Sequence, residues 1–434
     1  MTARFLAAPL LALAVVAAPV PQSQAGRTGL APKADSLWSL ILAPILRSEP
    51  WRDASRYDAA HVLMLPLHAA FSHHFEMGER GFAEHFRRFH EVSRSVRLDR
   101  DSEVSWLQYL YLASRFAALS ADHGHRELVP KGLPLQLRKW VAELWQDHQA
   151  RHWTQGPFHG FGARVRWKLA ASRPAVWERS YPRAILDSEQ FLFAIAADLR
   201  HYGRVTGSPL AGDALLDSIA DIALQVYRQR VVWGPAGGWT FQPGVWRDHK
   251  DFRYACREDK SPDLRPCILA DVAEDASHSH RSPLWLRSLA DGSPPASPER
   301  HYYLALADGL ERQFFGRVLE PPSPEFDGWR LHNFMDGRNG IYRWGYASLG
   351  PEQGYGAFEL SGTLLHGWWA FLPGERTRKL YQDLAERFPL PAEQVTVYAG
   401  PASRRDAAGA LRNGLAELLC RLAAGLPGVN PGSS

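Results

Sequence analysis

The residues of this chain best suited to chemistry form one short polar segment, Glu274-Asp275-Ala-Ser-His278-Ser-His280-Arg281. Two acids, two histidines and an arginine within eight residues can transfer protons and bind an anion. The unperturbed pKa of histidine lies near neutrality, so His278 or His280 can act as a base. This segment is therefore the first candidate for an active site.

The spacing of the segment predicts how its side chains would be presented. If residues 271–290 form a helix, Glu274, His278 and Arg281 fall at i, i+4 and i+7, on one face. Asp271, Asp275 and His278 make an overlapping stripe. The alternative is a solvated helix start, with Asp271 or Asp275 as its N-cap and acids near the positive end of the helix dipole.

Aromatic residues gather next to this segment. The chain has 16 tryptophans, and Trp239 and Trp246 lie in the loop that precedes the polar residues. Three long loops rich in aromatics and arginine are expected, at 152–167, 233–254 and 326–346. They are too aromatic for disorder, and long loops of this kind are usually functional. We expect Trp239 and Trp246 to bind the flat faces of sugar rings.

The N-terminus has the pattern of a secretory signal peptide. Arg4 precedes an apolar run from residue 5 to 20, and Ser23-Gln-Ala25 offers small residues for cleavage. The run is short for a membrane span and contains prolines. Removing residues 1–25 leaves 49 basic and 46 acidic residues, a formal net charge of +3. We expect a periplasmic or secreted protein without an integral span in the mature chain, and the small charge does not indicate nucleic-acid binding.

Three cysteines are present. An oxidising compartment permits a disulfide, and Cys256 with Cys267 is the natural pair, which leaves Cys420 buried in an apolar helix. No CxxC pair favours zinc, and no phosphate-binding loop, dinucleotide fingerprint or nucleophile elbow is found. The sequence predicts no cofactor.

The rest of the chain predicts a mainly all-α protein of paired helices with a few short β pieces. In 187–205 and 211–230, apolar residues repeat at helical spacing, with Asp187 or Ser188 as cap and Val-Thr-Gly-Ser-Pro at 205–209 between them, which predicts a helical hairpin. Short strands are expected at 239–241 and 341–344. The other expected helices are 34–47, 56–77, 80–93, 102–119, 134–150, 271–290, 299–317, 357–371, 375–386 and 405–423.

Three stretches together resemble a known architecture: Tyr202-Gly-Arg-Val-Thr-Gly, Gly237-Gly-Trp-Thr-Phe and Glu274-Asp-Ala-Ser-His-Ser-His. An exported helical-hairpin chain with these stretches resembles the (α/α) toroid families of carbohydrate-active proteins. These include six-hairpin glycosidases, alginate- and heparin-type polysaccharide lyases and the helical domain of glucuronyl C5-epimerases. The resemblance covers about residues 180–385 and identifies no single family. It implies one toroid domain over 26–434, in which 388–434 is a helical extension with a flexible tail, and a polysaccharide or oligosaccharide ligand bound where the long loops converge.

A polysaccharide lyase or C5-epimerase removes the proton beside a uronate carboxylate. It needs a base, a proton donor and a group that neutralises the carboxylate. An acid at i−4, Glu274, can orient His278. The candidates are His278 or His280 as base, Tyr342 or Tyr346 as donor, and Arg281, Arg338, Asn339 or Arg343 as neutralisers, with Trp344 in the same segment.

Three alternatives remain open. A glycoside hydrolase needs two carboxyl groups, roughly 5–5.5 Å apart for retention or 6.5–9.5 Å for inversion, and its candidates are Asp271, Glu274 or Asp275 with Asp336, Glu352 or Glu359. A divalent cation bound by Asp271, Asp275 and His278, with His73, His74 or His249, is a weaker alternative, because no zinc spacing is present. A glycan-binding envelope protein without activity fits the aromatic residues equally well.

Overall fold

The computed structural model describes residues 29–53, 55–93, 95, 103–152, 155–170, 179–261, 263–346, 350, 353–401 and 407–427. The expected signal peptide and the expected C-terminal tail lie outside these residues. Among the described residues, no helix is long and apolar enough to cross a membrane.

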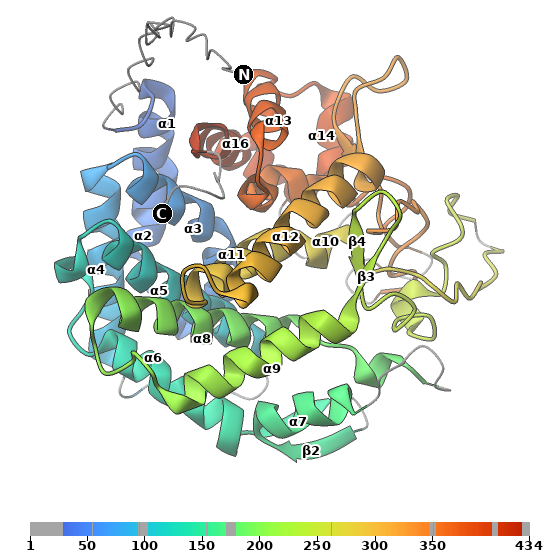
Figure 1. Ribbon diagram of the computed structural model, residues 1–434. Helices are drawn as coiled ribbons and strands as arrows, with labels where there is room; N and C mark the ends of the chain where they lie inside the picture. Colours follow the sequence, from blue (N-terminus) through green and yellow to red (C-terminus); the bar gives the residue numbers. More distant parts are fainter. Residues whose placement is uncertain are drawn as a thin grey trace, which may run out of the picture.

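The protein is mainly helical, as predicted (Figure 1). The larger helices are α3 (Ser55–Ser72), α4 (Glu76–Ser93), α5 (Glu103–Asp122), α6 (Leu133–Ala142), α7 (Gly160–Leu169), α8 (Asp187–Thr206), α9 (Ala214–Arg230), α11 (Ser282–Gly292), α12 (Pro298–Gln313), α13 (Glu375–Glu386) and α16 (Leu415–Gly425). Shorter ones are α1 (Pro32–Leu37), α2 (Ala43–Arg47), α10 (Ala276–Ser279), α14 (Ala392–Ala399) and α15 (Ala407–Arg412).

The β structure consists of three small antiparallel pairs in the described residues. They are β1 (Gln149–His152) with β2 (Gln155–His159), β3 (Val231–Trp233) with β4 (Trp239–Phe241), and β5 (Leu319–Glu320) with β6 (Arg330–Leu331). The strand expected at 239–241 is β4. The piece expected at 341–344 forms only isolated bridges, Tyr254 with Ile341 and Tyr342 with Tyr355.

Neighbouring helices pack in a consistent order. Helix α3 packs against α5, α5 against α8 and α8 against α11, while α16 packs against α3 and α13. Helix α5 is buried over most of its length, which explains why its apolar residues are not confined to one stripe. Helices α4, α9 and α12 pack against α3, α8 and α11 respectively, and α8 with α9 is the hairpin that the sequence predicts.

Four expectations about elements were wrong or incomplete. The region 271–290 is not one helix: residues 272–274 lie outside any helix or strand, Asp275 is extended, and α10 and α11 follow. Residues 357–371 form the 3₁₀ segments Ser361–His366 and Trp368–Phe371 rather than an α-helix. The loop expected at 152–167 contains β2 and most of α7. Helix α14, within the predicted C-terminal extension, was not expected.

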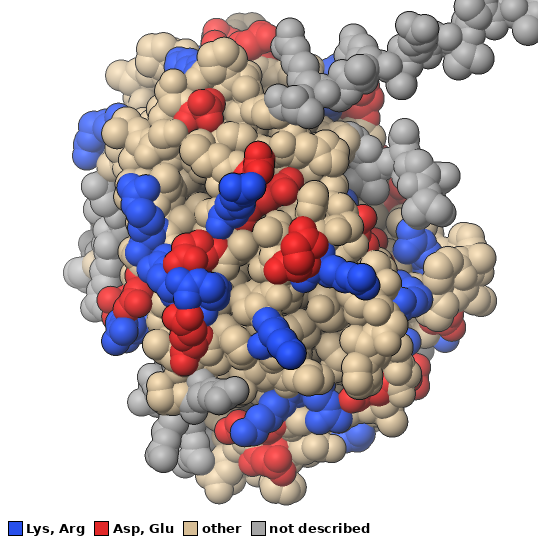
Figure 2. Space-filling model, turned by 90° about the vertical axis from the view of Figure 1, so that its left-hand side faces the viewer, with Lys and Arg blue, Asp and Glu red and all other residues tan. Residues whose placement is uncertain are grey.

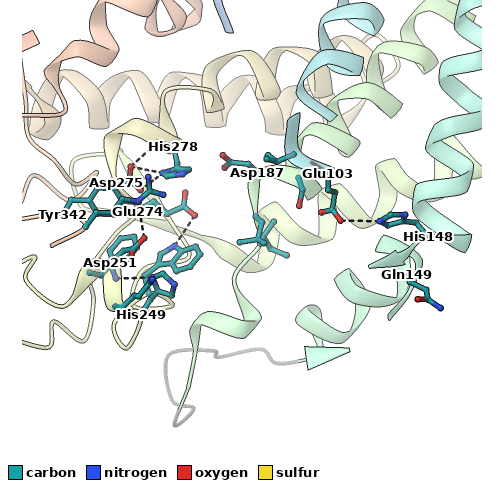
Figure 3. Close-up of a pocket in the computed structure, with 18 residues that line it drawn as sticks. Glu103, His148, Gln149, Asp187, His249, Asp251, Glu274, Asp275, His278 and Tyr342 are labelled. Atoms are coloured by element: carbon teal, nitrogen blue, oxygen red, sulfur yellow. Dashed lines mark hydrogen bonds and ion pairs between the residues drawn. The ribbon is translucent and has the colours of Figure 1, made fainter. Parts of the chain in front are cut away.

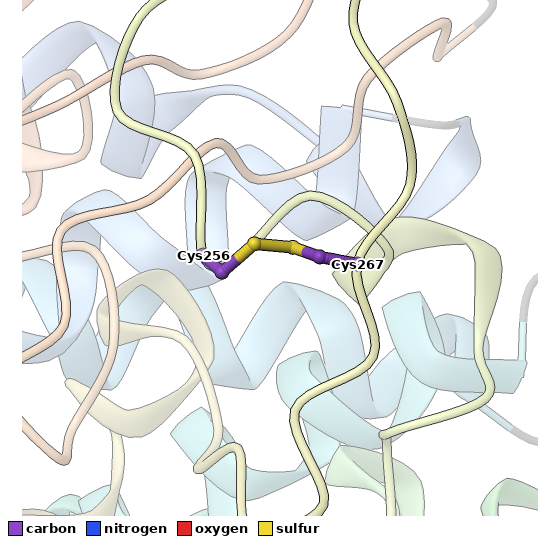
Figure 4. The surroundings of a disulfide bond; sticks show 2 residues. All are labelled: Cys256 and Cys267. Carbon is purple, nitrogen blue, oxygen red and sulfur yellow. A yellow bond between two sulfur atoms is a disulfide. The ribbon is translucent and has the colours of Figure 1, made fainter.

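The apolar residues form two separate cores. The large one joins the helices. The small one contains Phe252, Ala255, Val272, Phe334, Tyr342 and Leu360, with Trp246 and Tyr355 packed against it. The predicted disulfide between Cys256 and Cys267 is present beside this small core (Figure 4), and Cys420 is a buried free thiol, as expected.

The charged surface shows no segregation of sign on the face that carries α4. Figure 2 shows Lys and Arg interspersed with Asp and Glu there. Arg87, for example, pairs with both Glu84 and Glu91 along α4.

Candidate active site

A cavity of about 950 Å³ lies between the two cores. This volume is at the upper end of the range for small-ligand pockets. Trp246, Phe252 and Tyr342, which belong to or pack against the small core, line the cavity on one side. Ile185, which belongs to the large core, lines it on the other side. The complete lining is Glu103, Val104, His148, Gln149, Ile185, Leu186, Asp187, Ser188, Trp246, His249, Lys250, Asp251, Phe252, Glu274, Asp275, His278, Tyr342 and Arg343.

The segment that carries Glu274 and Asp275 is not helical because its backbone bonds to another segment. Ala276 N donates to Asn333 O at 2.8 Å and Met335 N donates to Glu274 O at 2.9 Å, so Asp275 forms an antiparallel bridge with Phe334. These bonds to a distant segment take the place of the i→i−4 hydrogen bonds that a helix would form here. Glu274 and His278 therefore do not lie on one helical face, although the structure still brings both to the cavity (Figure 3).

Asp275 is the N-cap of α10, as the helix-start interpretation predicted, but it is buried rather than solvated. Its Oδ1 accepts hydrogen bonds from Ser277 N at 3.1 Å and His278 N at 3.2 Å. The same carboxylate meets the His278 ring, with Nδ1 at 2.9 Å from Oδ1 and 2.8 Å from Oδ2. Nε2 of His278 makes no hydrogen bond with any residue in the described part of the chain, and the side chain is 33% exposed. This nitrogen is available to a ligand.

The proton states of the two residues are coupled. Burial would raise the pKa of Asp275, but the charge of His278 and its hydrogen bond hold that pKa below its usual range. Burial would lower the pKa of His278, but the charges of Asp275 and Asp187 raise it above its ordinary value. The pair thus favours an ionised aspartate beside a more basic imidazole.

Glu274 has the opposite character. Burial raises its pKa to about 8, and the charges of Asp187 and Asp275 add to the effect, while a hydrogen bond from Gln242 opposes it. Gln242 Nε2 donates to Glu274 Oε1 at 2.6 Å, and the same amide group exchanges two bonds with the backbone of Ile185, both 2.9 Å. Near neutral pH Glu274 is therefore a protonated carboxyl group held in a fixed place.

Arg343 and Tyr342 complete this side of the cavity. Arg343 has a φ of +57°, a strained conformation for a residue with a side chain, and Gln242 has a φ of +38°. Arg343 N donates to Asp251 O at 2.9 Å and its Nε donates to Asp251 Oδ2 at 3.2 Å. Burial raises the pKa of Tyr342 well above its usual value, and the charge of Asp275 adds to this, so the hydroxyl stays protonated.

A close approach of two loops places Tyr342 and Arg343. A Cβ on Gly340 would lie 1.9 Å from Ala255 O, so only glycine fits at this position. The contact allows Ile341 N to donate to Tyr254 O at 3.2 Å and to Arg257 O at 2.6 Å. The disulfide lies next to this contact. Cys267 N donates to Arg253 O at 2.7 Å, which holds Cys267 beside the segment that contains Tyr254 and Ala255.

Six of the predicted site residues line the cavity: Glu274, Asp275, His278, Tyr342, Trp246 and Arg343. Two of the three expected loops, 233–254 and 326–346, supply three of them, Trp246, Tyr342 and Arg343. Trp246 stacks on Phe252, with ring centroids 5.4 Å apart and an interplanar angle of 8°.

Three predicted catalytic residues do not line the cavity. His280 is buried behind the site, where its Nδ1 lies 2.7 Å from Ser277 O and its ring stacks on that of His61. Arg281 is 3% exposed and bonds to Asp187. Tyr346 lies beneath the guanidinium of Arg343, at 4.7 Å.

Four predicted substrate-binding residues also have other surroundings. Trp239 is 3% exposed, and its Nε1 donates to Leu306 O at 2.7 Å within the core. Arg338 pairs with Asp336 and Asp271. Asn339 is buried, and its Oδ1 accepts from Phe358 N at 2.9 Å. Trp344 lies beside Tyr254, with ring centroids 6.2 Å apart.

Most partners expected for a carboxylate pair or a metal are not in the cavity, although His249, one of the candidate metal ligands, lines it. Glu359 pairs with Lys260 and Asp336 with Arg338, while Glu352 lies outside the described residues. Asp271 is exposed and separate from Asp275 and His278. Within the described residues no group of three His, Cys, Asp or Glu side chains is placed to hold a metal ion.

Sequence reasoning missed several cavity residues. Asp187 was expected only as a helix cap, and it is the first residue of α8. Lys250 and Asp251 lie in the aromatic loop 233–254. Two oppositely charged residues in an aromatic loop are the sequence feature that could have identified them as site residues. Glu103 and His148 come from a stretch without any motif, so only the folded chain brings them to the site.

No known protein family, no characterised protein and no solved structure matches this chain. The chemistry of the cavity is therefore the basis on which a function can be argued.

Proposed function

We propose that the protein acts on a uronate-containing polysaccharide by proton abstraction of the lyase or epimerase type, with His278 as the base. The observation that carries this proposal is the Asp275–His278 pair, in which Nδ1 is held by the carboxylate while Nε2 is open to the cavity. A carboxylate at Nδ1 fixes the ring and makes Nε2 the nitrogen that receives a proton.

In this mechanism, His278 Nε2 removes the proton from C5 of the uronate. Negative charge then develops on the uronate carboxylate, and the protonated Glu274 donates a hydrogen bond to it, as an uncharged carboxyl group can in a site of raised pKa. Arg343 and Lys250 line the same cavity and add positive charge. Of the predicted neutralisers Arg281, Arg338, Asn339 and Arg343, Arg343 is the one that lines the cavity.

The second half of the reaction distinguishes the two enzyme types. In a lyase, the C5–H electrons form the C4–C5 double bond, the C4–O bond breaks, and the leaving oxygen takes a proton. Tyr342 is a suitable donor because its hydroxyl remains protonated. In an epimerase, C5 instead receives a proton from the opposite face, and no bond to oxygen breaks.

The aromatic surface supports a carbohydrate ligand. Trp246 lies at the cavity and is fixed by its stacking on Phe252. An indole ring held in this way offers a flat apolar surface, which can bind the C–H face of a sugar at little cost in side-chain entropy.

We also propose the (α/α) toroid as the arrangement of the helices. The order of packing supports it: α3, α5, α8 and α11 follow one another, α11 contacts the segment Trp368–Phe371, that segment contacts α13, α13 contacts α16, and α16 returns to α3. An experimental structure in which α16 did not lie beside α3 would contradict the ring.

Export is proposed on the signal-peptide pattern and is supported by the disulfide, since such bonds persist in oxidising compartments. Mass spectrometry of cell fractions tests it. We expect a periplasmic or secreted chain that begins at Gly26, and a cytosolic chain with residues 1–25 retained would contradict export.

A glycoside hydrolase is the second candidate, because the cavity holds a carboxyl group suited to general acid catalysis. Glu274 stays protonated to about pH 8, whereas neighbouring Asp275 stays ionised. Carboxyl groups whose pKa values are driven apart are typical of acid and base pairs in glycosidases. Asp187 or Glu103, on the other wall, would then activate water.

A glycan array followed by product analysis tests these proposals. An unsaturated uronate in the product, or exchange of the C5 hydrogen in deuterated water, supports proton abstraction. New reducing ends without unsaturation support hydrolysis and contradict the lyase proposal. Binding without any product indicates a glycan-binding protein, and failure of uronate glycans to bind overturns the proposed function.

A further inference from the structure

The wall of the cavity opposite His278 is built from different elements and has different chemistry. In Figure 3, Asp187 faces the group that contains Glu274, Asp275, His278 and Tyr342, and Glu103 lies farther from that group, beside His148. Asp187 is the first residue of α8, and Glu103 is the first residue of α5. Their carboxylate side chains are 21% and 20% exposed.

A buried arginine lies behind each of these carboxylates. Arg281 Nη1 donates to Asp187 Oδ2 at 2.8 Å, and it also holds Tyr57 and His61 of α3. Arg164 Nη2 lies 3.5 Å from Glu103 Oε1. Asp187 Oδ1 makes no hydrogen bond with a residue that the structure describes, so this oxygen is available to a ligand in the cavity.

We propose that Asp187 and Glu103 form a subsite for an uncharged sugar beside the uronate, so that the substrate is a heteropolysaccharide rather than a polymer of uronates alone. This inference rests on the proposed function and concerns the same cavity. Fixed carboxylate oxygens accept hydrogen bonds from sugar hydroxyl or amide N–H groups.

The same wall disfavours a second uronate. A carboxylate placed there would lie near two fixed negative charges, and neither arginine is free to turn towards it. Like charges repel more strongly where water is excluded, so a second uronate should bind less tightly at this wall than an uncharged sugar. Specificity then comes from rejection of the wrong sugar as well as from contacts to the right one.

The test compares two sets of defined oligosaccharides of equal length. One set contains only galacturonate or only mannuronate, and the other alternates glucuronate with N-acetylglucosamine. Binding is measured by calorimetry on the full chain, and turnover is measured separately. The variants are Asp187→Asn and Glu103→Gln, which keep shape and hydrogen bonding but remove charge. Asp217→Asn is the control, because Asp217 of α9 pairs with Arg200 of α8 and does not line the cavity.

We expect the unaltered protein to bind the alternating oligosaccharides at least about tenfold more tightly, which corresponds to about 1.4 kcal/mol. Asp187→Asn or Glu103→Gln should reduce this preference several-fold, mainly by improving binding of the uronate-only set, and the control should not. If Asp187→Asn fails to fold because Arg281 loses its partner, Glu103→Gln decides the result. Equal or tighter binding of uronate-only oligosaccharides overturns the subsite but leaves the proposed function standing. If neither set binds, both fail.

Discussion

One carboxylate group, that of Asp275, both begins α10 and holds the ring of His278. Its Oδ1 accepts hydrogen bonds from the backbone of Ser277 and His278, while both of its oxygens lie within 2.9 Å of His278 Nδ1. The position of the helix and the position of the imidazole are therefore set by the same atoms. Chemistry and local structure can be separated only by substitutions that keep the cap.

His278→Gln is expected to lower kcat by about 10²–10⁴, the usual contribution of a general acid or base. Its melting temperature should change little, because the ring is partly exposed and Asp275 keeps its cap bonds. The matched control is His280→Gln, which alters a buried ring behind the site and should reduce stability more than rate. If His278→Gln unfolds the protein while activity per folded molecule survives, His278 is a structural residue.

Asp275→Asn separates the two roles of this residue. Asparagine is as good an N-cap as aspartate, so helix α10 should persist. Removing the charge takes away an interaction that raises the pKa of His278, so that pKa should fall. The acidic limb of the pH–rate profile should move to lower pH, with a lower maximal rate. An unchanged acidic limb would show that His278 is not the group that titrates there.

The pH–rate profile is expected to be bell-shaped. Activity should rise as His278 loses its proton, above the ordinary histidine range, and fall as Glu274 loses its proton near pH 8. Glu274→Gln should remove the alkaline limb, since glutamine still donates a hydrogen bond but does not titrate. Persistence of that limb in the variant would assign it to another group.

Glu274 also makes stability depend on pH. Its folded-state pKa is raised, so the folded protein holds this proton more tightly than the unfolded chain does. The stability from Glu274 is fully present below its ordinary pKa and is lost as pH rises through about 8. Urea unfolding across this pH range should show that the free energy of unfolding declines less with rising pH for Glu274→Gln than for the unaltered protein.

The two tryptophans expected to bind sugar should now behave differently. Trp246→Ala is expected to weaken glycan binding more than turnover at saturation, because stacking serves the ground state and the transition state alike. Trp239→Ala should instead destabilise the fold by about 3–5 kcal/mol, the range for a large buried side chain. Calorimetric affinity and urea midpoints for both variants check this contrast.

Reduction of the disulfide should affect the site before the helices. The bridge joins residues 11 positions apart, and closing a loop of this size contributes about 3 kcal/mol. The Cys256→Ser, Cys267→Ser protein should retain its helical circular dichroism but lose activity. The reason is that Tyr254 and Arg257, which flank Cys256, bond to Ile341 and so position the adjacent Tyr342. Cys420→Ala, which keeps the bridge, is the control. Full activity in the doubly substituted protein would contradict this role.

The sequence predicted most helices because their apolar periodicity and stop signals are local. The hairpin of α8 and α9 follows from the spacing of Leu192, Ile195 and Leu199 and from the turn after Thr206. The non-helical segment 272–275 could not be predicted in this way, since its backbone bonds to Gly244 and Met335, and that of the following Ala276 to Asn333, all far away in the sequence. Long-range pairing overrode a helical pattern.

The chemistry of the site was also only partly readable. His278, Asp275 and Glu274 were found because they are adjacent, although the reason given for their alignment was wrong. The burial of Trp239 and Arg281 depends on packing against α12 and α3, which no local pattern encodes. Glu103 begins α5 and His148 lies just before β1, in stretches without a motif, and only tertiary structure brings them to the cavity.

The separation of the two cores implies that this molecule has more than one cooperative unit. The small core buries only six apolar side chains, whereas the large one joins nearly all the helices. Amide hydrogens of residues 250–256 and 338–346 should exchange with solvent through an opening of lower free energy than global unfolding. On gentle heating, the wall of the cavity that carries Tyr342 and Arg343 would then be lost while the helical scaffold remains intact, and cooling would restore it.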